Sequence, residues 1–408
     1  MGSKTKLYSE KYSYFLFAFT VKLIMFVMNN KTQDMLLKKI SILFSFSFFL
    51  FHFQSFSQPK DSVAPKNLTD IPGIKISGYV DAYYAYYTDS VGTNNYQKFA
   101  DISPKSNQFG LNIVQITAQY SSEKVRAIGT IHYGDIATSA WSPVFNMIQE
   151  ANAGVRLTKK VWLDAGFFKT HIGTEALLPK DNITSGLSII TLYEPWWQAG
   201  VKLSYTPNSK ILFCVHVLNG YNTFVDNNKQ KSVGLTLTYA LGEKGSIGYF
   251  NLIGEESPDN RTSSHVRFLN NVVFNYQLTP KLKTIIGCDY ISQQHSNITD
   301  TTKSASIYSG ILVLKYQLKP KFGIYGRGEM FSDQQGILTG VITDKERKLT
   351  GYKLWGATLG LEFKPTESSF IRLESRELVM DKDQEIFYWN KKYTNSRMEV
   401  SLNIGVAF

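Results

Sequence analysis

The sequence predicts an all-β fold, a single transmembrane antiparallel β-barrel of about 16 strands. Polar and apolar residues alternate with a period of two from residue 75 to the last residue, which is the period of a strand. The connections between these segments alternate strictly between short and long, and an aromatic residue precedes six of the seven short ones. Together the three patterns favour a barrel with tight turns at one end and long loops at the other.

The composition excludes several other classes of protein. Of the 408 residues 14% are aromatic and only 19% are charged, which excludes intrinsic disorder. Cys214 and Cys288 are too few for a disulfide framework, and no cysteine or histidine cluster predicts a metal site or a metal cofactor. The first 57 residues, with seven Lys, no Arg, Glu10 and Asp34, carry +5 of the net charge of +11. The scattered remainder predicts no nucleic-acid partner.

The N-terminal region predicts export. Residues 35–57 resemble a secretory signal peptide, because two lysines precede the apolar stretch 40–53 and the small residues Ser55 and Ser57 precede a cleavage point. The alternative, a membrane-anchoring helix, is disfavoured because 14 apolar residues fall short of the about 20 that a bilayer needs.

The remaining boundaries follow from this leader. Residues 1–34 are interpreted as an upstream extension from a start codon assigned too early, and residues 58–74 as a periplasmic spacer. Past the leader no window of 18 apolar residues occurs, so the predicted membrane domain, residues 75–408, enters a bilayer as a closed barrel.

The turns and loops give the strand count. The seven short connections are 121–124, 158–160, 206–210, 241–245, 278–281, 318–321 and 364–369. The eight long ones are 90–107, 134–147, 171–195, 220–231, 254–263, 294–304, 332–349 and 380–396. This pattern requires 16 strands with both mature termini on the short-turn side, which is periplasmic in outer-membrane barrels.

Two features distinguish a membrane barrel from a soluble β-sandwich. The aromatic residues before the short turns predict a girdle at one membrane interface: Tyr120, Tyr205, Tyr239, Tyr276, Tyr316 and Phe363. The last strand alternates apolar residues at even positions and ends on Phe408. This ending resembles the C-terminal signal that the outer-membrane assembly machinery recognises, so Phe408 is predicted to be an assembly signal.

Four segments carry a family resemblance. They are ISGYVDAYYAYY in the first strand, IQEANAGVRL, GFFKTHIGTE at 166–175, and VLNGYN with Asp226 to Asn228. They are similar to the OmpL-like β-barrel porin family of Gram-negative outer membranes, over most of residues 75–408. The resemblance implies a single-chain barrel that encloses a pore.

The charged residues identify the face that lines the predicted pore, because a charge facing lipid costs about 2–4 kcal/mol at the bilayer midplane. The ten basic members are Arg126, Arg156, Lys202, Arg267, Lys315, Arg327, Lys364, Arg372, Arg376 and Arg397. The eight acidic members are Asp81, Glu150, Asp164, Asp289, Glu329, Glu362, Glu374 and Glu399. They form either a ladder of paired charges or a transverse field that orients solutes, with a weak preference for anions.

The loop 171–195 is the predicted constriction. It is the longest connection and is rich in apolar residues, which predicts that it packs inside the barrel. Folded inward, it would bring Glu175, Lys180 and Asp181 towards three wall residues, Arg327, Arg372 and Arg376. The alternatives are that the loop caps the outer rim or packs on a neighbouring subunit.

The predicted function is an outer-membrane porin for passive diffusion of small hydrophilic solutes, and not an enzyme. The mature histidines have no catalytic motif around them, which disfavours an outer-membrane hydrolase, and Cys214 beside His216 lacks a third orienting group. The alternative is a substrate-selective uptake channel or surface binding protein, for example for sugars, which four aromatic residues expected on the wet face keep open: Tyr79, Tyr83, Trp196 and Tyr325. The expected partners are outer-membrane lipid, lipopolysaccharide and the assembly machinery, with a homo-oligomer left open and no cofactor.

Overall fold

The structure is a computed structural model, and it describes residues 73–89, 92, 94–99, 102–257 and 264–408. The upstream extension 1–34, the signal peptide 35–57 and almost all of the spacer 58–74 lie outside the described residues. Within that part of the chain, no helix is long and apolar enough to cross a membrane.

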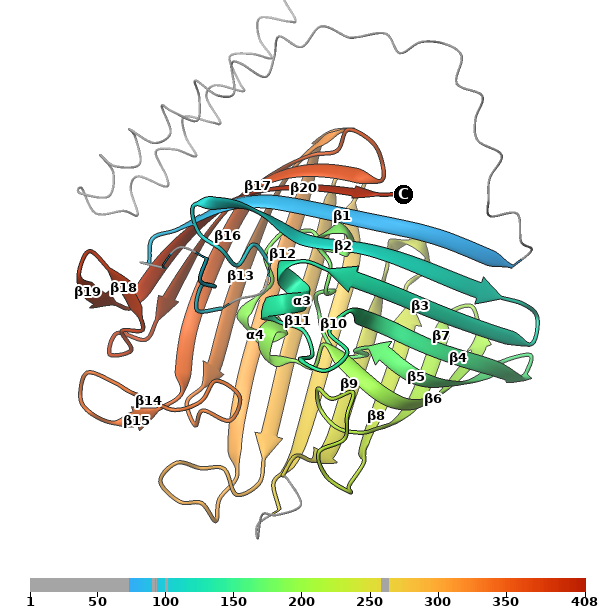
Figure 1. Ribbon diagram of the computed structural model, residues 1–408, viewed down its shortest axis with the longest axis horizontal. Helices are drawn as coiled ribbons and strands as arrows, with labels where there is room; N and C mark the ends of the chain where they lie inside the picture. Colours follow the sequence, from blue (N-terminus) through green and yellow to red (C-terminus); the bar gives the residue numbers. More distant parts are fainter. Residues whose placement is uncertain (1–72, 90–91, 93, 100–101, 258–263) are drawn as a thin grey trace, which may run out of the picture. The chain divides into compact units, whose positions relative to one another are not determined.

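Sixteen antiparallel strands close into one barrel, which confirms the predicted fold class (Figure 1). The eight strands of the first half are β1 (Ile74–Tyr87), β2 (Gln108–Ser121), β3 (Val125–Tyr133), β4 (Ile148–Thr158), β5 (Val161–Lys169), β6 (Trp197–Asn208), β7 (Ile211–Leu218) and β8 (Ser232–Ala240). The eight of the second half are β9 (Gly245–Glu255), β10 (Val266–Thr279), β11 (Leu282–Gln293), β12 (Ala305–Lys319), β13 (Phe322–Asp333), β16 (Tyr352–Phe363), β17 (Ser369–Met380) and β20 (Ser396–Ala407).

The barrel closes where the last strand meets the first. β20 pairs with β1 from Tyr79 opposite Ala407 to Tyr87 opposite Glu399. Phe408 extends this pairing, because its amide donates to the Gly78 carbonyl at 3.0 Å and its carbonyl accepts from the Gly78 amide at 2.8 Å. The Phe408 side chain is 75% exposed, on the same outward face as Ile404 and Val406. No strand edge is left unpaired at the seam.

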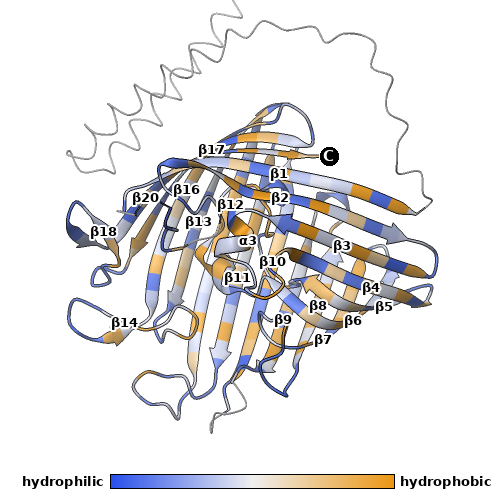
Figure 2. Ribbon diagram, viewed as in Figure 1, coloured by the Kyte–Doolittle hydropathy of each residue, from blue (hydrophilic) through white to orange (hydrophobic). Residues whose placement is uncertain are grey.

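Alternation along each strand separates an outer from an inner face, and Figure 2 shows the alternating hydrophilic and hydrophobic bands. On β12 the residues Tyr308, Leu312 and Leu314 are exposed, whereas their neighbours Ile311 and Val313 are buried. The exposed set forms the apolar outer belt. Four of the six predicted girdle residues are also exposed on the outer face: Tyr120, Tyr205, Tyr239 and Tyr316.

The inner face departs from a simple polar lining. Along β9 to β17 it carries buried apolar residues, namely Leu252, Leu269, Ile291, Ile307, Ile311, Val313, Phe331, Leu354 and Leu378. Water would not stably wet such a surface, so parts of the long loops must cover it. The inner face of these strands thus carries apolar residues among its charged ones, which is the sequence signal for an inner wall that is partly covered.

The short elements lie in the long connections. They are α3 (Asp135–Ser139), η2 (Pro179–Asp181), α4 (Ile189–Tyr193), and the hairpins β14 (Ile342–Thr343) with β15 (Leu349–Thr350) and β18 (Phe387–Trp389) with β19 (Lys392–Thr394); a further short turn, η3 (Gly242–Lys244), joins β8 to β9. Figure 1 shows α3 and α4 within the ring of strands and both hairpins at its margin.

Candidate functional site

The connection between β5 and β6, residues 170–196, folds into the barrel and is called the inner loop below. It contains η2 and α4, and Figure 1 shows α4 framed by the strands. The loop does not rest on the inner wall by apolar contact alone. Two arginines and two carboxylates of the wall bind it at defined atoms.

Arg327 on β13 is one of the two wall arginines that bind the loop. Its Nη1 lies 2.6 Å from Glu175 Oε1 and donates to the Gly186 carbonyl at 2.6 Å and to Thr184 Oγ1 at 3.2 Å. Its Nη2 lies 3.4 Å from Thr358 Oγ1 on β16. The Arg327 side chain is 0% exposed. A single buried guanidinium therefore joins two segments of the inner loop to two strands of the wall.

Arg372 on β17 binds the loop through backbone carbonyls. Its Nη1 donates to the Pro179 and Thr184 carbonyls at 2.8 and 3.1 Å, and its Nη2 donates to the Asn182 carbonyl at 2.8 Å. Its Nε donates to Glu362 Oε2 at 2.8 Å, which fixes the orientation of the guanidinium. The planar fork of arginine suits this arrangement, since it offers donors in several directions at once.

The wall carboxylates bind the loop amides. Glu374 accepts from the Ser185 and Gly186 amides at 2.7 and 2.9 Å, and Glu329 accepts from the Ile189 amide at 2.7 Å, where α4 begins. The wall arginines thus bind carbonyl groups of the loop, and the wall carboxylates bind its amide groups. Such charge-assisted bonds are shorter and stronger than neutral ones.

Apolar contacts complete the packing of the inner loop on two walls. Ile189 and Ile190 of α4 are buried against the apolar inner face of β9 to β17. Leu178 and Leu187 belong to a second cluster that includes Tyr79 on β1 and other residues of the opposite side. Because it contributes to both clusters, the loop lies across the lumen.

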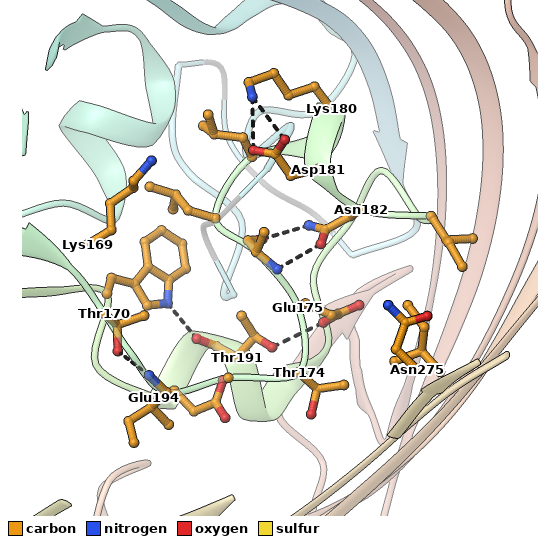
Figure 3. Close-up of a pocket in the computed structure, with 18 of the residues that line it drawn as sticks. Lys169, Thr170, Thr174, Glu175, Lys180, Asp181, Asn182, Thr191, Glu194 and Asn275 are labelled. Carbon is orange, nitrogen blue, oxygen red and sulfur yellow. Dashed lines mark hydrogen bonds and ion pairs between the residues drawn. The ribbon is translucent and has the colours of Figure 1, made fainter. Parts of the chain in front are cut away.

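The structure brings together only part of the predicted constriction. Glu175 reaches Arg327, but Lys180 and Asp181 pair with each other at 2.9 Å and do not contact the predicted arginines (Figure 3). Arg376 pairs with Glu329 at 2.7 Å and lies 3.7 Å from Glu399, both on the wall. The expectation was incomplete because sequence gives the charge of a loop residue but not the direction of its side chain.

The aromatic residues expected on a wet face are buried, so that expectation is wrong. The exposed fractions are 0% for Tyr79, 3% for Tyr83, 5% for Trp196 and 3% for Tyr325. Their polar atoms are bound internally: Tyr79 to Asp81, Tyr83 to Asp135, Tyr325 to Glu374, and Trp196 to the Thr191 carbonyl. They cannot form a stacking surface for a sugar in this conformation.

A cavity of about 600 Å³ lies beneath the inner loop, at the short-turn end of the barrel. Its wall side presents Lys283, Lys315, Lys364 and Arg372, with Glu362 between them. Its loop side includes Thr174, Glu175, Lys180, Asp181 and Glu194 (Figure 3). It also touches Lys169 and Thr170, where the loop leaves β5.

The wall formed by β3 to β6 is wetter. A second cavity, of about 370 Å³, is lined there by Arg126, Glu150, Asp164 and Lys202, and it shares Lys169 and Thr170 with the first. Arg126 pairs with Asp164 at 2.5 Å and Lys169 with Glu150 at 3.1 Å. Arg156 stacks on Trp162 and Lys202 lies over Phe168. Neither of these two cations has an ion-pair partner in the described part of the chain.

The other predicted lining residues are held in polar networks. Asp81 accepts from Tyr79 and Asn112, Arg267 donates to Gln293 and stacks on Tyr221, and Asp289 accepts from Asn271 and Ser309. Asp81 and Asp289 are buried. These contacts place their side chains on the inner face of the wall, but they stiffen the wall and leave little of the carboxylates for solutes.

Two carboxyl groups of the inner loop have shifted pKa values. Burial alone would raise the pKa of Glu175, but the Arg327 guanidinium and hydrogen bonds from Ser188 hold it below its usual value. Burial and the nearby Asp289 carboxylate raise the pKa of Glu194 well above its usual value. The carboxyl group of Glu194 faces that of Asp289. The shift therefore favours the protonated form of Glu194 and the ionised form of Glu175.

The described residues contain no group of three or more His, Cys, Asp or Glu side chains that could hold a metal ion. His171 and His216 stack with ring centroids 4.0 Å apart, and their nitrogens face Gln198, Asn251 and Thr236. His132 bonds the Asn146 carbonyl and Gln149. The hydrogen-bond partners of these three histidines hold the rings in place and include no arrangement that orients a nucleophile.

Sequence reasoning missed the loop residues that carry the backbone contacts, chiefly Thr184, Ser185 and Gly186. It also missed Glu194. No residue type marks a carbonyl or amide as a ligand for a distant arginine or glutamate. The available signal was the small polar segment Thr184 to Gly186 between apolar residues, which permits close approach of the backbone to the wall.

Comparison with known proteins identifies a family and several solved structures that this chain is similar to. The profile of the family described as "Putative beta-barrel porin-2, OmpL-like" matches residues 73–408. No curated protein matches the chain.

Three solved structures share the architecture. The outer membrane channel DcaP of Acinetobacter baumannii is 11% identical, with a TM-score of 0.55 over 82% of this chain and 97% of that one. The anion-selective porin from Comamonas acidovorans is 10% identical, with a TM-score of 0.55 over 82% and 99% of the two chains. OprB of Pseudomonas putida is 9% identical, with a TM-score of 0.54 over 82% and 94%. At such identity the likeness shows the fold alone.

Proposed function

Since the chain belongs to the family of OmpL-like β-barrel porins and is an outer-membrane channel for passive diffusion, we propose that its inner loop sets the width of the aqueous path. The observation that carries this proposal is the attachment of residues 170–196 to the inner wall by Arg327 and Arg372. A loop held at so many atoms stays inside the lumen. Small hydrophilic solutes then pass where the loop leaves space.

The space that remains lies along β3 to β6 and beneath the loop. The two cavities share Lys169 and Thr170, and their other wall residues lie on β2 to β6, β10 to β12, β16 and β17. Lys202 lines this space and has no acidic partner in the described part of the chain. The path is therefore weakly selective for anions.

The short-turn end is the periplasmic end in this proposal, so that both mature termini are periplasmic. The outward apolar belt contacts lipid, and the long loops face lipopolysaccharide. Phe408, exposed at the seam beside Gly78, is available to the assembly machinery as a terminal signal. Deleting Phe408 is expected to lower the amount of barrel in the outer membrane more than Ser401→Ala on the inner face of the same strand, and equal amounts would contradict that role.

The porin proposal is tested in a planar bilayer. Protein purified from outer membranes is expected to give steady step currents in KCl that glucose and sucrose leave unchanged. A current that falls saturably with a sugar would favour the substrate-selective channel instead. The absence of any current from protein that retains heat-modifiable gel mobility, the sign of a folded barrel, would contradict both.

A catalytic role is not part of the proposal. The buried aromatic residues leave no stacking surface for sugar binding, and the histidines are bound to structural partners. The proposal holds for one copy or for several. Sedimentation of the protein in detergent measures whether three copies associate, as they do in the trimer form of OmpT from Vibrio cholerae.

A further inference from the structure

The cavity beneath the inner loop has an unusual distribution of charge. Its wall on β11 to β17 carries four cationic side chains, Lys283 on β11, Lys315 on β12, Lys364 just after β16 and Arg372 on β17. Lys169 of β5 also lines the cavity, but it pairs with Glu150. Glu362 is the single acidic residue among the wall residues that line it. We call the four cations of β11 to β17 and Glu362 the lysine vestibule.

The register of the sheet places these residues at one level. Lys283 is directly opposite Lys315 across β11 and β12, and Glu362 is directly opposite Arg372 across β16 and β17. All five lie close to the short turns. Their side chains therefore face one volume of about 600 Å³, which is within the size range of small-molecule sites.

Glu362 neutralises only part of this charge. Lys315 Nζ bonds Glu362 Oε1, and the Arg372 guanidinium bonds Oε2 at 2.8 Å, so one carboxylate serves two cations. Glu362 is 2% exposed, and each of its oxygens already binds one of these two cations. The pairing holds Lys315 and Arg372 in place while their surroundings stay positive.

The other two lysines are available. Lys283 is half-buried and has no ion-pair partner in the described part of the chain, and Lys364 lies 3.6 Å from Glu367, whose side chain is fully exposed. The acidic residues on the loop side do not compensate, because Asp181 pairs with Lys180 and Glu175 with Arg327. Several ammonium groups facing one cavity repel each other unless an anion lies between them.

We infer that the lysine vestibule binds small dianions, such as short dicarboxylates or doubly charged sulfate and phosphate. This inference rests on the proposed porin function and names the solutes that the channel retains. A dianion can contact Lys283 and Lys364 together, whereas a monoanion neutralises only one of them. Asn275 and Thr174 also line the cavity and add neutral donors for the remaining oxygens.

The test is inhibition of the KCl current by added anions in a planar bilayer at pH 8 and constant ionic strength. Succinate and sulfate are expected to reduce the current saturably, at concentrations about tenfold below those at which acetate does so, since the second charge adds a second close ion contact. The double variant Lys283→Gln, Lys364→Gln is expected to weaken succinate inhibition by about tenfold. Lys319→Gln, which removes one exposed lysine from the neighbouring turn, is the matched control and should leave it unchanged.

The outcomes separate this inference from the porin function itself. A normal current that succinate and acetate inhibit equally, or a double variant that keeps wild-type inhibition, would overturn the dianion site and leave the channel intact. No current from the folded wild type would contradict the porin function. If the gel mobility of the double variant shows that it does not fold, the single variant Lys283→Gln replaces it in the test. Succinate inhibition of that variant is expected to be about threefold weaker than in the wild type.

Discussion

The two halves of the inner wall use the same residue types in opposite ways. On β13 and β17 the side chains of Arg327 and Arg372 are 0% and 5% exposed, enclosed between wall and inner loop. On β3 and β5 the side chains of Arg126 and Lys169 are 36% and 41% exposed. One half of the lumen is therefore a packed interior, and the other is the wetted side.

Burial decides what these charges do. Removing one partner of a buried ion pair leaves an uncompensated charge and costs about 3–5 kcal/mol, whereas an exposed pair is worth at most about 1 kcal/mol. The cations of the packed half are thus expected to govern the position of the loop. Those of the wetted half are expected to govern which ions pass.

The largest effect is expected from Arg327→Ala. It leaves Glu175 buried without its cation and frees the Gly186 carbonyl, at a local cost of about 3–5 kcal/mol. The loop should detach, which raises the mean single-channel conductance and adds large current fluctuations. Arg156→Ala on the wetted half is the matched control, and a similar change in both variants would remove the distinction between the two halves.

A charge reversal on the wetted half should change selectivity without changing the width of the path. Lys202→Glu is expected to move the reversal potential in a KCl gradient towards cation selectivity, by about fivefold in the permeability ratio. Lys303→Glu, on an exposed loop residue, is the control. Arg372→Glu is a poorer probe than its charge suggests, because it would place a carboxylate beside Glu362 and three loop carbonyls and so displace the loop. An unchanged reversal potential in Lys202→Glu would show that ions do not pass along this wall.

A smaller effect is expected from pH, which should change the attachment of the inner loop through Glu194 at the end of α4. Because its pKa is raised in the folded loop, the folded state keeps a proton that the detached loop would lose above its ordinary pKa of about 4.5. The detached form then binds fewer protons, so attachment weakens as pH rises above that value. Current fluctuations are expected to increase from about pH 5 to about pH 9 in the wild type.

In Glu194→Gln the current fluctuations should stay equally small over that pH range, because the amide is neutral throughout. Asp181→Asn, which removes a partly exposed carboxylate from η2 of the same loop, is the control and should retain the wild-type pH dependence. Identical pH profiles for the wild type and Glu194→Gln would exclude Glu194 as the titrating group.

Sequence patterns were sufficient for the barrel because each strand is specified locally. Alternation over about ten residues fixes which face meets lipid, and short turns such as those before Val161 and Phe322 fix antiparallel pairing with the next strand. The outward face of the last strand was also predictable. Its apolar residues stand at even positions, and two of them, Ile404 and Val406, are exposed in the structure.

The inner loop was only partly predictable. Its apolar content indicated packing, and its acidic Glu175 indicated a basic partner, but the partner could have been any of several arginines. The contacts of Arg372 with loop carbonyls have no sequence signature, because every residue has a carbonyl. The apolar inner wall was assigned as polar because charged residues alone were used to identify that face, although Ile307, Ile311 and Val313 share it.

The central claim is that the inner loop narrows the aqueous path, and deletion of residues 177–190 tests it most directly. The deletion removes α4's first two residues, the Thr184–Gly186 segment and the apolar contacts on both walls. The measurement is the single-channel conductance in KCl of the deleted and the complete protein, each shown to be a folded barrel by heat-modifiable mobility. The account predicts a clearly higher conductance after the deletion. An unchanged conductance in a folded deletion variant would contradict it and place the constriction elsewhere.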